Sequence, residues 1–224
     1  MAKKTSIIMN CWNQTRTHAH MSMAAVANIT KFTDPEDYEL ILIDNEPKWP
    51  IRDDYHVLKI DKHIINEKDM GYTGSFNYGA KIAIGDYLVF IQNDVFVHEG
   101  WLPGLRYIIE CGWDMVFPDQ VPRSREYVKA TYDKDPLDPD SLTGGRDAGL
   151  LMCTKESFKK TGGWDSSLGL LAERDFFERF IGSWTDTNKV IITHITAATN
   201  MDLLERDSDE YDRRMEKDAS KLNA

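Results

Sequence analysis

The sequence lacks the features that typify membrane-inserted, secreted and disulfide-linked proteins. Its longest apolar runs, such as residues 87–91, are far shorter than the ~20 residues that span a bilayer. No apolar leader of about 7–15 residues follows the basic start. The three cysteines, Cys11, Cys111 and Cys153, are widely spaced and odd in number, which argues against a disulfide framework or a zinc knuckle. We therefore expect a cytoplasmic protein with no membrane insertion.

An excess of positive charge is also absent. The 27 lysines and arginines are outnumbered by 37 aspartates and glutamates, which gives a formal net charge of −10. This balance argues against broad, nonspecific binding to nucleic acid, because such binding needs a basic surface. A local basic contact stays open, since Arg123, Arg125 and Lys129 lie close together in the chain.

Three common enzyme motifs are missing as well. The chain has no GxxxxGKS or GxxxxGKT phosphate loop, no GxGxxG after its first apolar run, and no HExxH. Kinases that use a phosphate loop, dinucleotide-dependent dehydrogenases and zinc proteases therefore lack their signatures here. The function has to be sought in other patterns.

Alternating apolar runs and helical periodicities dominate what is present. With 224 residues, the chain is long enough for one large domain with a sizeable core. Strands are predicted at residues 6–9, 38–43, 56–60, 87–91, 150–153 and 190–194, and helices at residues 17–32, 75–84 and 173–181. This alternation predicts a single α/β domain of Rossmann type, with a mostly parallel central sheet flanked by helices.

Two segments stand apart from this pattern. Residues 119–149 mix prolines with charges of both signs, and a loop of this length in a compact domain is usually functional, so we interpret it as a lid. Residues 202–224 are charged on most faces and are expected to form a peripheral helix or a frayed tail. The main domain is accordingly assigned to residues 1–201.

Polar side chains follow three of the predicted strands. They occupy residues 10–13, the pair Asp44 and Asn45, and residues 92–94. In open α/β sheets, ligands bind at the carboxyl ends of the strands. One polar strand end would mean little, but three together indicate a polar small-molecule site.

Six segments, in order along the chain, resemble the family 2 glycosyltransferases, which have the GT-A fold. They are SIIMNCWN at 6–13, ELILIDN at 39–45, the stretch from Asn77 to Val95 with the family's N-x-G and metal motifs, GGWD at 162–165, AERDFFER at 172–179 and HITAAT at 194–199. Each segment alone is a weak signal. Their shared order over residues 5 to about 200 makes the resemblance strong.

The resemblance implies a transferase that uses a nucleotide-diphospho-sugar, UDP-linked, with Mn²⁺ or Mg²⁺ and with inversion at the anomeric carbon. The metal would be held by Asp94 and His194, whose oxygen and nitrogen atoms suit such ions. The nucleotide would be held by six residues: Trp12, Asn13, Asp44, Asn77, Asn93 and Asp94. Trp12 could stack on the base, and Asp44 could accept its imide N–H.

The candidate general bases are Asp175 and Glu173. They lie two positions apart, so on a regular helix their side chains leave in different directions and only one can easily point into the site. Asp175 is favoured because it aligns with the aspartate of the family's E-E-N-D pattern, and Glu173 remains open. A partly buried carboxylate there could take the proton of the acceptor hydroxyl.

Two departures from the family pattern leave other functions open. Gln92 stands where the family has the first acid of its metal motif, and Ala172 stands where it has the first acid of E-E-N-D. A nucleotide-sugar-binding module without catalysis is therefore the main alternative, and a nucleotidyltransferase is a weaker one. The acceptor is open among a glycan, a small molecule and a modified DNA base, as in bacteriophage enzymes of this type.

Overall fold

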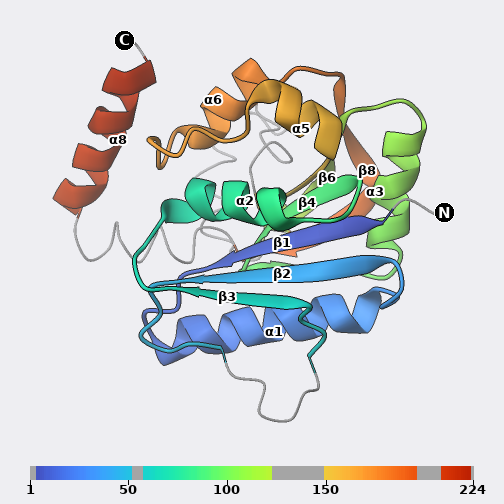
Figure 1. Cartoon of the computed structure of the whole chain (residues 1–224), viewed down its shortest axis with the longest axis horizontal. Helices are drawn as coiled ribbons and strands as arrows, with labels where there is room; N and C mark the ends of the chain where they lie inside the picture. Colours follow the sequence, from blue (N-terminus) through green and yellow to red (C-terminus); the bar gives the residue numbers. More distant parts are fainter. Residues whose placement is uncertain (1–3, 52–57, 123–148, 196–207, 223–224) are drawn as a thin grey trace.

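One mixed sheet forms the centre of the protein. The computed structural model describes residues 4–51, 58–122, 149–195 and 208–222. Within them, the strands follow the order β3-β2-β1-β4-β7-β6-β8-β5. Figure 1 shows β3, β2 and β1 side by side above α1. The strands are β1 (Thr5–Cys11), β2 (Tyr38–Asn45), β3 (Lys62–Asn66), β4 (Tyr87–Gln92), β5 (Val95–Phe96), β6 (Met115–Pro122), β7 (Leu150–Thr154) and β8 (Trp184–His194). The helices are α1 (Arg16–Phe32), α2 (Gly71–Ile82), α3 (Trp101–Glu110), α5 (Lys155–Thr161), α6 (Ala172–Arg179) and α8 (Ser208–Leu222).

The sheet combines parallel and antiparallel pairs. Strands β1, β2, β3 and β4 run parallel, whereas β7 runs antiparallel to both of its neighbours, β4 and β6. β6 pairs in parallel with β8, and the short β5 pairs antiparallel to the end of β8. The carboxyl ends of β1, β2 and β4 therefore lie along one edge of the sheet, as the sequence predicts.

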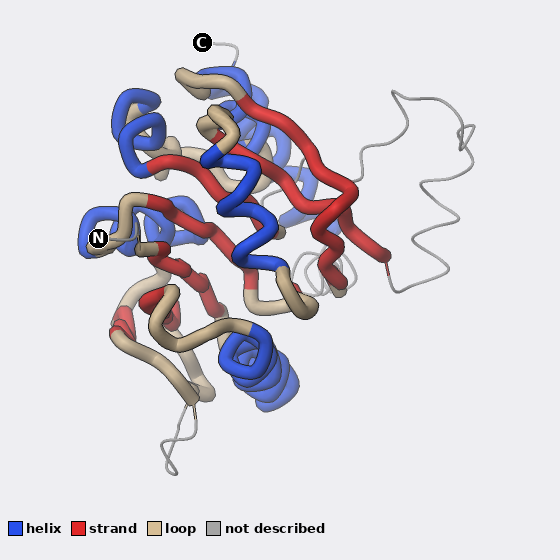
Figure 2. The backbone as a smooth tube through the Cα atoms, turned by 90° about the vertical axis from the view of Figure 1, so that its right-hand side faces the viewer, coloured by secondary structure: helices blue, strands red, loops and turns tan. Residues whose placement is uncertain are grey.

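Helices cover both faces of the sheet, which explains why its central strands contain continuous apolar runs. On one face, Met9 and Leu42 share a core with Val26 of α1 and Leu105 of α3. On the other face lies a second core, to which α2, α5 and α6 contribute Phe76, Phe158 and Phe176. Figure 2 shows the strands between these helices. Strands buried on both faces read as continuous apolar runs.

Gly79 explains the close seat of α2 on the sheet. A Cβ added there would lie 2.3 Å from Cγ2 of Ile8 in β1. A side chain at this position would push the helix off the strand. The glycine of the N-x-G segment is therefore required by packing.

Glu39 is a buried carboxylate at the amino end of β2, away from the carboxyl ends of the strands. Glu39 accepts hydrogen bonds from Ser6 Oγ at 2.5 Å, the Ile84 N–H at 2.6 Å and Lys62 Nζ at 2.6 Å. Burial raises the pKa of Glu39, but these hydrogen bonds outweigh it, so its pKa lies below the ordinary value. The network ties the end of α2 to β1, β2 and β3.

Several predicted boundaries are wrong. The strand predicted at residues 56–60 is β3 at Lys62–Asn66, because Ile41–Asn45 of β2 pair with that segment while Leu58 and Ile60 pack against the α1 side of the core. β8 begins at Trp184 rather than at 190, because its first half is a polar, largely exposed strand. α2 begins at Gly71 rather than at 75.

Four elements were not foreseen from the sequence: β5, α3, β6 and α5. β6 extends to Pro122 and so includes the first four residues of the predicted lid, whereas residues 123–148 lie outside the described part of the chain. In the charged tail, α8 forms a helix at the margin of the molecule (Figure 1). None of the helices in the described segments is both long and apolar enough to cross a membrane.

Candidate active site

The polar residues predicted at the strand ends do meet at one edge of the sheet. Cys11 at the end of β1 pairs with Asp44 at the end of β2, and Asn10 pairs with Gln92 at the end of β4. Asp44 is fully buried, and Asp94 is 2% exposed just beyond β4. Carboxylates at such depth need partners, because an isolated buried charge is unfavourable.

A chain of hydrogen bonds joins the ends of β2 and β4 across the start of α1. Asn13 Nδ2 donates to Asp44 Oδ1 at 2.9 Å, and Ser22 Oγ donates to Asn13 Oδ1 at 2.8 Å. Asn93 Nδ2 then donates to Ser22 Oγ at 2.7 Å. Three of the predicted nucleotide-site residues are thus brought together, and Ser22 is a fourth member that sequence reasoning missed. The sequence signal for Ser22 is its position on the helical face of α1 that also buries Val26, where a polar side chain needs a partner.

Asp44 also holds the loop that follows β2. Its Oδ2 accepts the Ile51 N–H at 3.2 Å. Burial raises the pKa of Asp44 and outweighs the opposing hydrogen bonds from Ile51 and Asn13. Among the described residues, one hydrogen bond reaches each oxygen of this carboxylate, and a carboxylate oxygen can accept two.

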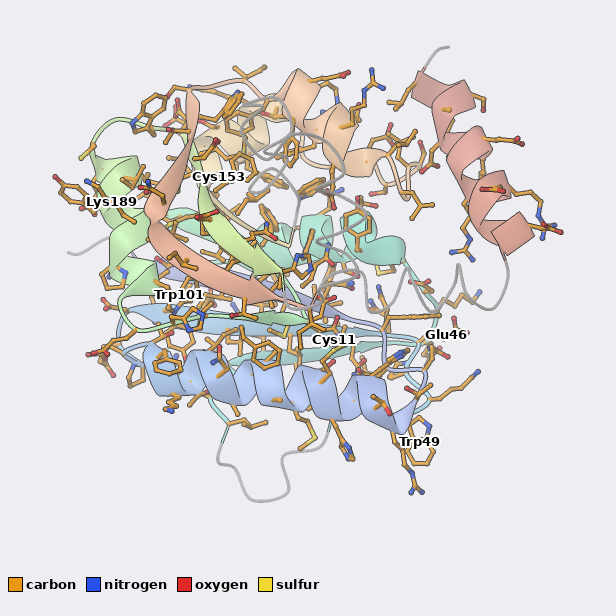
Figure 3. The ribbon with its side chains drawn as sticks, turned by 180° about the vertical axis from the view of Figure 1, so that it is seen from behind. Cys11, Glu46, Trp49, Trp101, Cys153 and Lys189 are labelled. Atoms are coloured by element: carbon orange, nitrogen blue, oxygen red, sulfur yellow. The ribbon has the colours of Figure 1, made fainter. Side chains whose placement is uncertain are left out.

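The loop after β2 is fastened to the end of β1. The N–H groups of Lys48 and Trp49 both donate to the Asn13 carbonyl, at 3.1 and 3.0 Å. The guanidinium of Arg16 lies 4.5 Å from the centre of the Trp49 ring. Trp49 and Glu46 project at this end of the protein, near the start of α1 (Figure 3).

Trp12 lies on the same stretch and is half-buried. Its ring is roughly parallel to that of His18, with centroids 6.2 Å apart. Trp12 directly precedes Asn13, whose carbonyl accepts the hydrogen bonds from the loop after β2. Part of the Trp12 side chain is exposed.

Asp94 and His194 form the second part of the site. β5 places His194 opposite Val95, next to Asp94, and the Ile195 N–H donates to the Asp94 carbonyl at 2.9 Å. Asp94 Oδ1 lies 3.3 Å from His194 Nε2. The other ring nitrogen, Nδ1, lies 3.0 Å from Gln120 Oε1, which fixes the orientation of the imidazole. The two residues predicted as metal ligands therefore converge.

The Asp94 and His194 pair fits a divalent cation. Asp94 Oδ1 is buried and has no hydrogen-bond partner within the described segments. Two ligand atoms at about 2.1 Å from one ion and at right angles to each other lie about 3.0 Å apart, close to the observed spacing. No group of three or more acidic, histidine or cysteine side chains gathers in the described residues. Mg²⁺ bound to proteins usually keeps several waters and takes one or two carboxylates, so a site with few protein ligands is compatible with it.

Asn77 is not part of this cluster. Its Nδ2 donates to the Trp164 carbonyl at 2.8 Å and to Ser166 Oγ at 3.0 Å, while its Oδ1 accepts the Trp164 N–H at 2.9 Å. All of these bonds tie α2 to the turn after α5. The observed contacts of Asn77 are thus with the GGWD segment.

Asp175 is engaged by an arginine on its own helix. Arg179 Nε donates to Asp175 Oδ1 at 2.8 Å, and Arg179 Nη2 donates to Oδ2 at 2.5 Å. The same guanidinium donates to the carbonyls of Thr161 and Gly163. The hydrogen bonds that Arg179 donates to the Asp175 carboxylate raise the pKa of Arg179. The pair thereby fastens α6 to the end of α5.

Glu173 leaves α6 in a different direction from Asp175. It lines a cavity of about 400 Å³ beside β6 and the start of β8. The other lining residues are Met115, Phe117, Leu170, Leu171, Arg174, Phe177, Glu178 and Trp184. A mostly apolar cavity of this size with a few charged groups at its margin is typical of small-molecule sites. The sequence prediction that the two carboxylates diverge is consistent with these contacts.

A comparison with protein-family models relates the chain to a known family. The family model described as Glycosyl transferase family 2 matches residues 6–160. The matched segment runs from β1 to α5 and contains Asn13, Asp44 and Asp94. Glu173, Asp175 and His194 lie beyond it.

Proposed function

Since this chain belongs to glycosyltransferase family 2, we propose that it moves a sugar from a UDP-linked donor to an acceptor hydroxyl, with Mn²⁺ or Mg²⁺ as cofactor. The observation that carries the proposal is the buried approach of Asp94 Oδ1 to His194 Nε2 at 3.3 Å, beside the hydrogen-bonded cluster of Asn13 and Asp44. The three free cysteines agree with the reducing, cytoplasmic location that we also propose.

The two halves of the site have separate roles in this proposal. Asp44 and Asn13 would line the pocket for the nucleobase, and a further acceptor position of the Asp44 carboxylate would take the imide N–H of uracil. Trp12 offers a flat surface to the same base. Asn93 links this pocket to Asp94 through Ser22.

Asp94 and His194 would hold the divalent cation. When bound, the cation supplies charge stabilisation to the departing diphosphate. The protein contributes the two ligand atoms, the orientation of the imidazole by Gln120, and a buried setting in which electrostatic interactions are stronger than in water.

Glu173 is our choice for the general base, in preference to Asp175. Proton uptake by Asp175 would break its bidentate contact with Arg179. Glu173 lies in the first turn of α6 and faces the cavity. In the proposed step, the acceptor oxygen bonds to the anomeric carbon as the bond from that carbon to the diphosphate breaks. The hydroxyl proton passes to the carboxylate of Glu173, and the anomeric configuration inverts.

The acceptor is proposed only by class. A glycan, a small molecule and a modified DNA base all carry suitable hydroxyls. The basic residues that would favour DNA, Arg123, Arg125 and Lys129, lie outside the described residues. Retardation of duplex DNA in a gel that weakens as salt rises would favour the DNA acceptor.

A donor screen tests the proposal. The purified chain is heated with each of a panel of nucleotide-sugars, with and without Mn²⁺. A ligand that binds only the folded state raises the melting temperature by mass action. We expect a UDP-sugar to give the largest rise, and only with the metal. A rise with GDP- or CMP-sugars but not with UDP-sugars would contradict uracil as the nucleobase of the donor.

A second candidate is a binding module that has lost catalysis, favoured by Gln92 and Ala172 at two acidic positions of the family pattern. The donor found in the screen distinguishes the two. Slow release of UDP in water supports the enzyme. Tight donor binding with no UDP release and no transfer at any divalent metal supports the module.

A further inference from the structure

α8 carries a buried carboxylate that none of the preceding roles explains. Of its described side chains, Asp212 and Glu216 are exposed, whereas Asp218 is only 4% exposed. A carboxylate is unfavourable at such depth unless it is hydrogen-bonded. Its partners therefore indicate what α8 does.

The partners of Asp218 are backbone groups immediately before α6. Its Oδ2 accepts the Gly169 N–H at 2.8 Å and the Leu171 N–H at 3.2 Å. One turn further along α8, the ammonium of Lys221 donates to the Ser167 carbonyl. The segment that enters α6 is thus held at alternate residues by one face of α8.

α6 lacks a capping side chain of its own. Its N-cap position is Leu171, which makes no side-chain cap hydrogen bond. Helices normally satisfy their first N–H groups with a Ser, Thr, Asp or Asn at this position. Asp218 supplies a carboxylate at the entry to α6 from a distant part of the chain. Charge-assisted hydrogen bonds of this kind are stronger than neutral ones.

Glu173 lies in the turn that this contact fixes, two residues after Leu171. The phenol of Tyr72 lies close to both Glu173 and Asp218. Burial raises the pKa of Tyr72, and the charges of these two carboxylates raise it further. The neighbouring Thr73 Oγ1 donates to the Leu168 carbonyl at 3.4 Å. The segment before α6 is therefore held by α8 on one side and by α2 on the other.

We propose that Asp218 is a positioning residue, which holds the backbone of residues 169–171 and so fixes the direction in which α6 presents Glu173 to the acceptor. The inference rests on the proposed function in one respect, that Glu173 acts as the base. Neither core cluster of the described residues contains a residue of α8. Loss of the Asp218 carboxylate should therefore alter the entry to α6 without unfolding the domain.

The test compares four full-length variants with the wild type. Asp218→Ala removes the acceptor, and Asp218→Asn keeps an oxygen that can accept the same N–H groups. Asp212→Ala and Glu216→Ala make the same change of charge at exposed positions of α8. The measurements are hydrogen exchange at the amides of Gly169 and Leu171, and UDP release from the UDP-sugar that the wild type uses, with Mn²⁺ saturating.

We expect Asp218→Ala to speed exchange at both amides and to lower kcat, each by about tenfold, the worth of a lost helix cap. The donor KM should stay within about twofold, because the donor site lies on other elements. Asp218→Asn should recover most of both effects. The two exposed-site variants should match the wild type.

Two outcomes would overturn the inference. One is exchange at Gly169 and Leu171 in Asp218→Ala that equals exchange in Asp212→Ala. The other is lost protection with an unchanged kcat in an active enzyme, which would make the contact purely structural. If the wild type releases no UDP from any donor yet exchange still depends on Asp218, sugar transfer is contradicted while the hold on α6 is supported.

Discussion

Glu173 and Asp175 of α6 should respond to neutralisation in different ways. Glu173→Gln and Asp175→Asn each remove one negative charge with little change of shape. Glu173 faces the cavity, whereas Asp175 forms a bidentate pair with Arg179 that fastens α6 to α5. We expect the first change to reduce catalysis and the second to reduce stability.

The magnitudes follow from these contacts. Loss of a positioned base lowers the chemical step by about 10²–10⁴-fold, so kcat of Glu173→Gln should fall by that factor with the melting temperature unchanged. In Asp175→Asn, Arg179 loses a charged partner. A charged hydrogen bond contributes about 1.5–3 kcal/mol, which we reduce to about 1–2 kcal/mol because the Arg179 side chain is 37% exposed. In a chain of this size, that lowers the melting temperature by roughly 2–8 °C.

The assay is UDP release under saturating donor and Mn²⁺, with thermal unfolding measured on the same samples. Arg179→Gln serves as the matched control, because it breaks the same pair from the other side and should reproduce the loss of stability with kcat largely retained. An Asp175→Asn variant that is inactive but fully stable, beside an active Glu173→Gln, would refute the reasoning and restore Asp175 as the base.

Three further predictions concern the surrounding structure. Ser22→Ala should weaken UDP binding and lower stability by about 1–3 kcal/mol, because it leaves the buried Asn93 amide without its acceptor; calorimetry and unfolding measure both, and unchanged values would remove Ser22 from the site. Gly79→Ala should lower stability by about 1–3 kcal/mol through its clash with Ile8, so an unchanged urea midpoint would contradict the packing. The pKa of Glu39 is lower in the folded state, so its contribution to stability is present above its unfolded pKa and is lost as pH falls through the folded pKa. Glu39→Gln should therefore flatten the pH dependence of the free energy of unfolding in the acid range. Parallel curves for the variant and the wild type would disprove this.

The centre of the fold could be predicted from the sequence because its strands are buried on both faces. β1, β2, β4 and β7 each contain a continuous apolar run, and the burial of these runs leaves little freedom in assigning the strands. The polar strand ends were predictable for the same reason, since parallel strands bring their carboxyl ends to one edge. Asp44 and Asn13 meet there as a consequence.

The margins of the sheet could not be predicted in this way. β3 is an edge strand with alternate residues exposed, and a second apolar run at 56–60 competed for the assignment. The first half of β8 is mostly polar because it is largely exposed. Local patterns give no signal for contacts between distant segments, such as the hydrogen bonds from Asp218 in α8 to Gly169 and Leu171.

The bidentate pair of Asp175 and Arg179 illustrates a third limit. Their spacing of four residues is visible in the sequence and is typical of helix salt bridges. In the sequence, the similarity of Asp175 to the aspartate of the family motif favours it as the base, whereas this spacing favours a salt bridge. The contacts of the guanidinium with Thr161 and Gly163, which make the pair a fastening for α6, depend on the folded chain.

The central claim is that Asp94 helps to hold the cation on which transfer depends, and one measurement tests it most directly. UDP release is titrated with Mn²⁺ in the wild type, in Asp94→Ala and in Asp86→Ala, which removes an exposed aspartate at the opposite end of β4. The account predicts that Asp86→Ala follows the wild-type titration, whereas Asp94→Ala folds normally and shows no metal-dependent release. Near wild-type activity of Asp94→Ala at the same Mn²⁺ concentrations would contradict it.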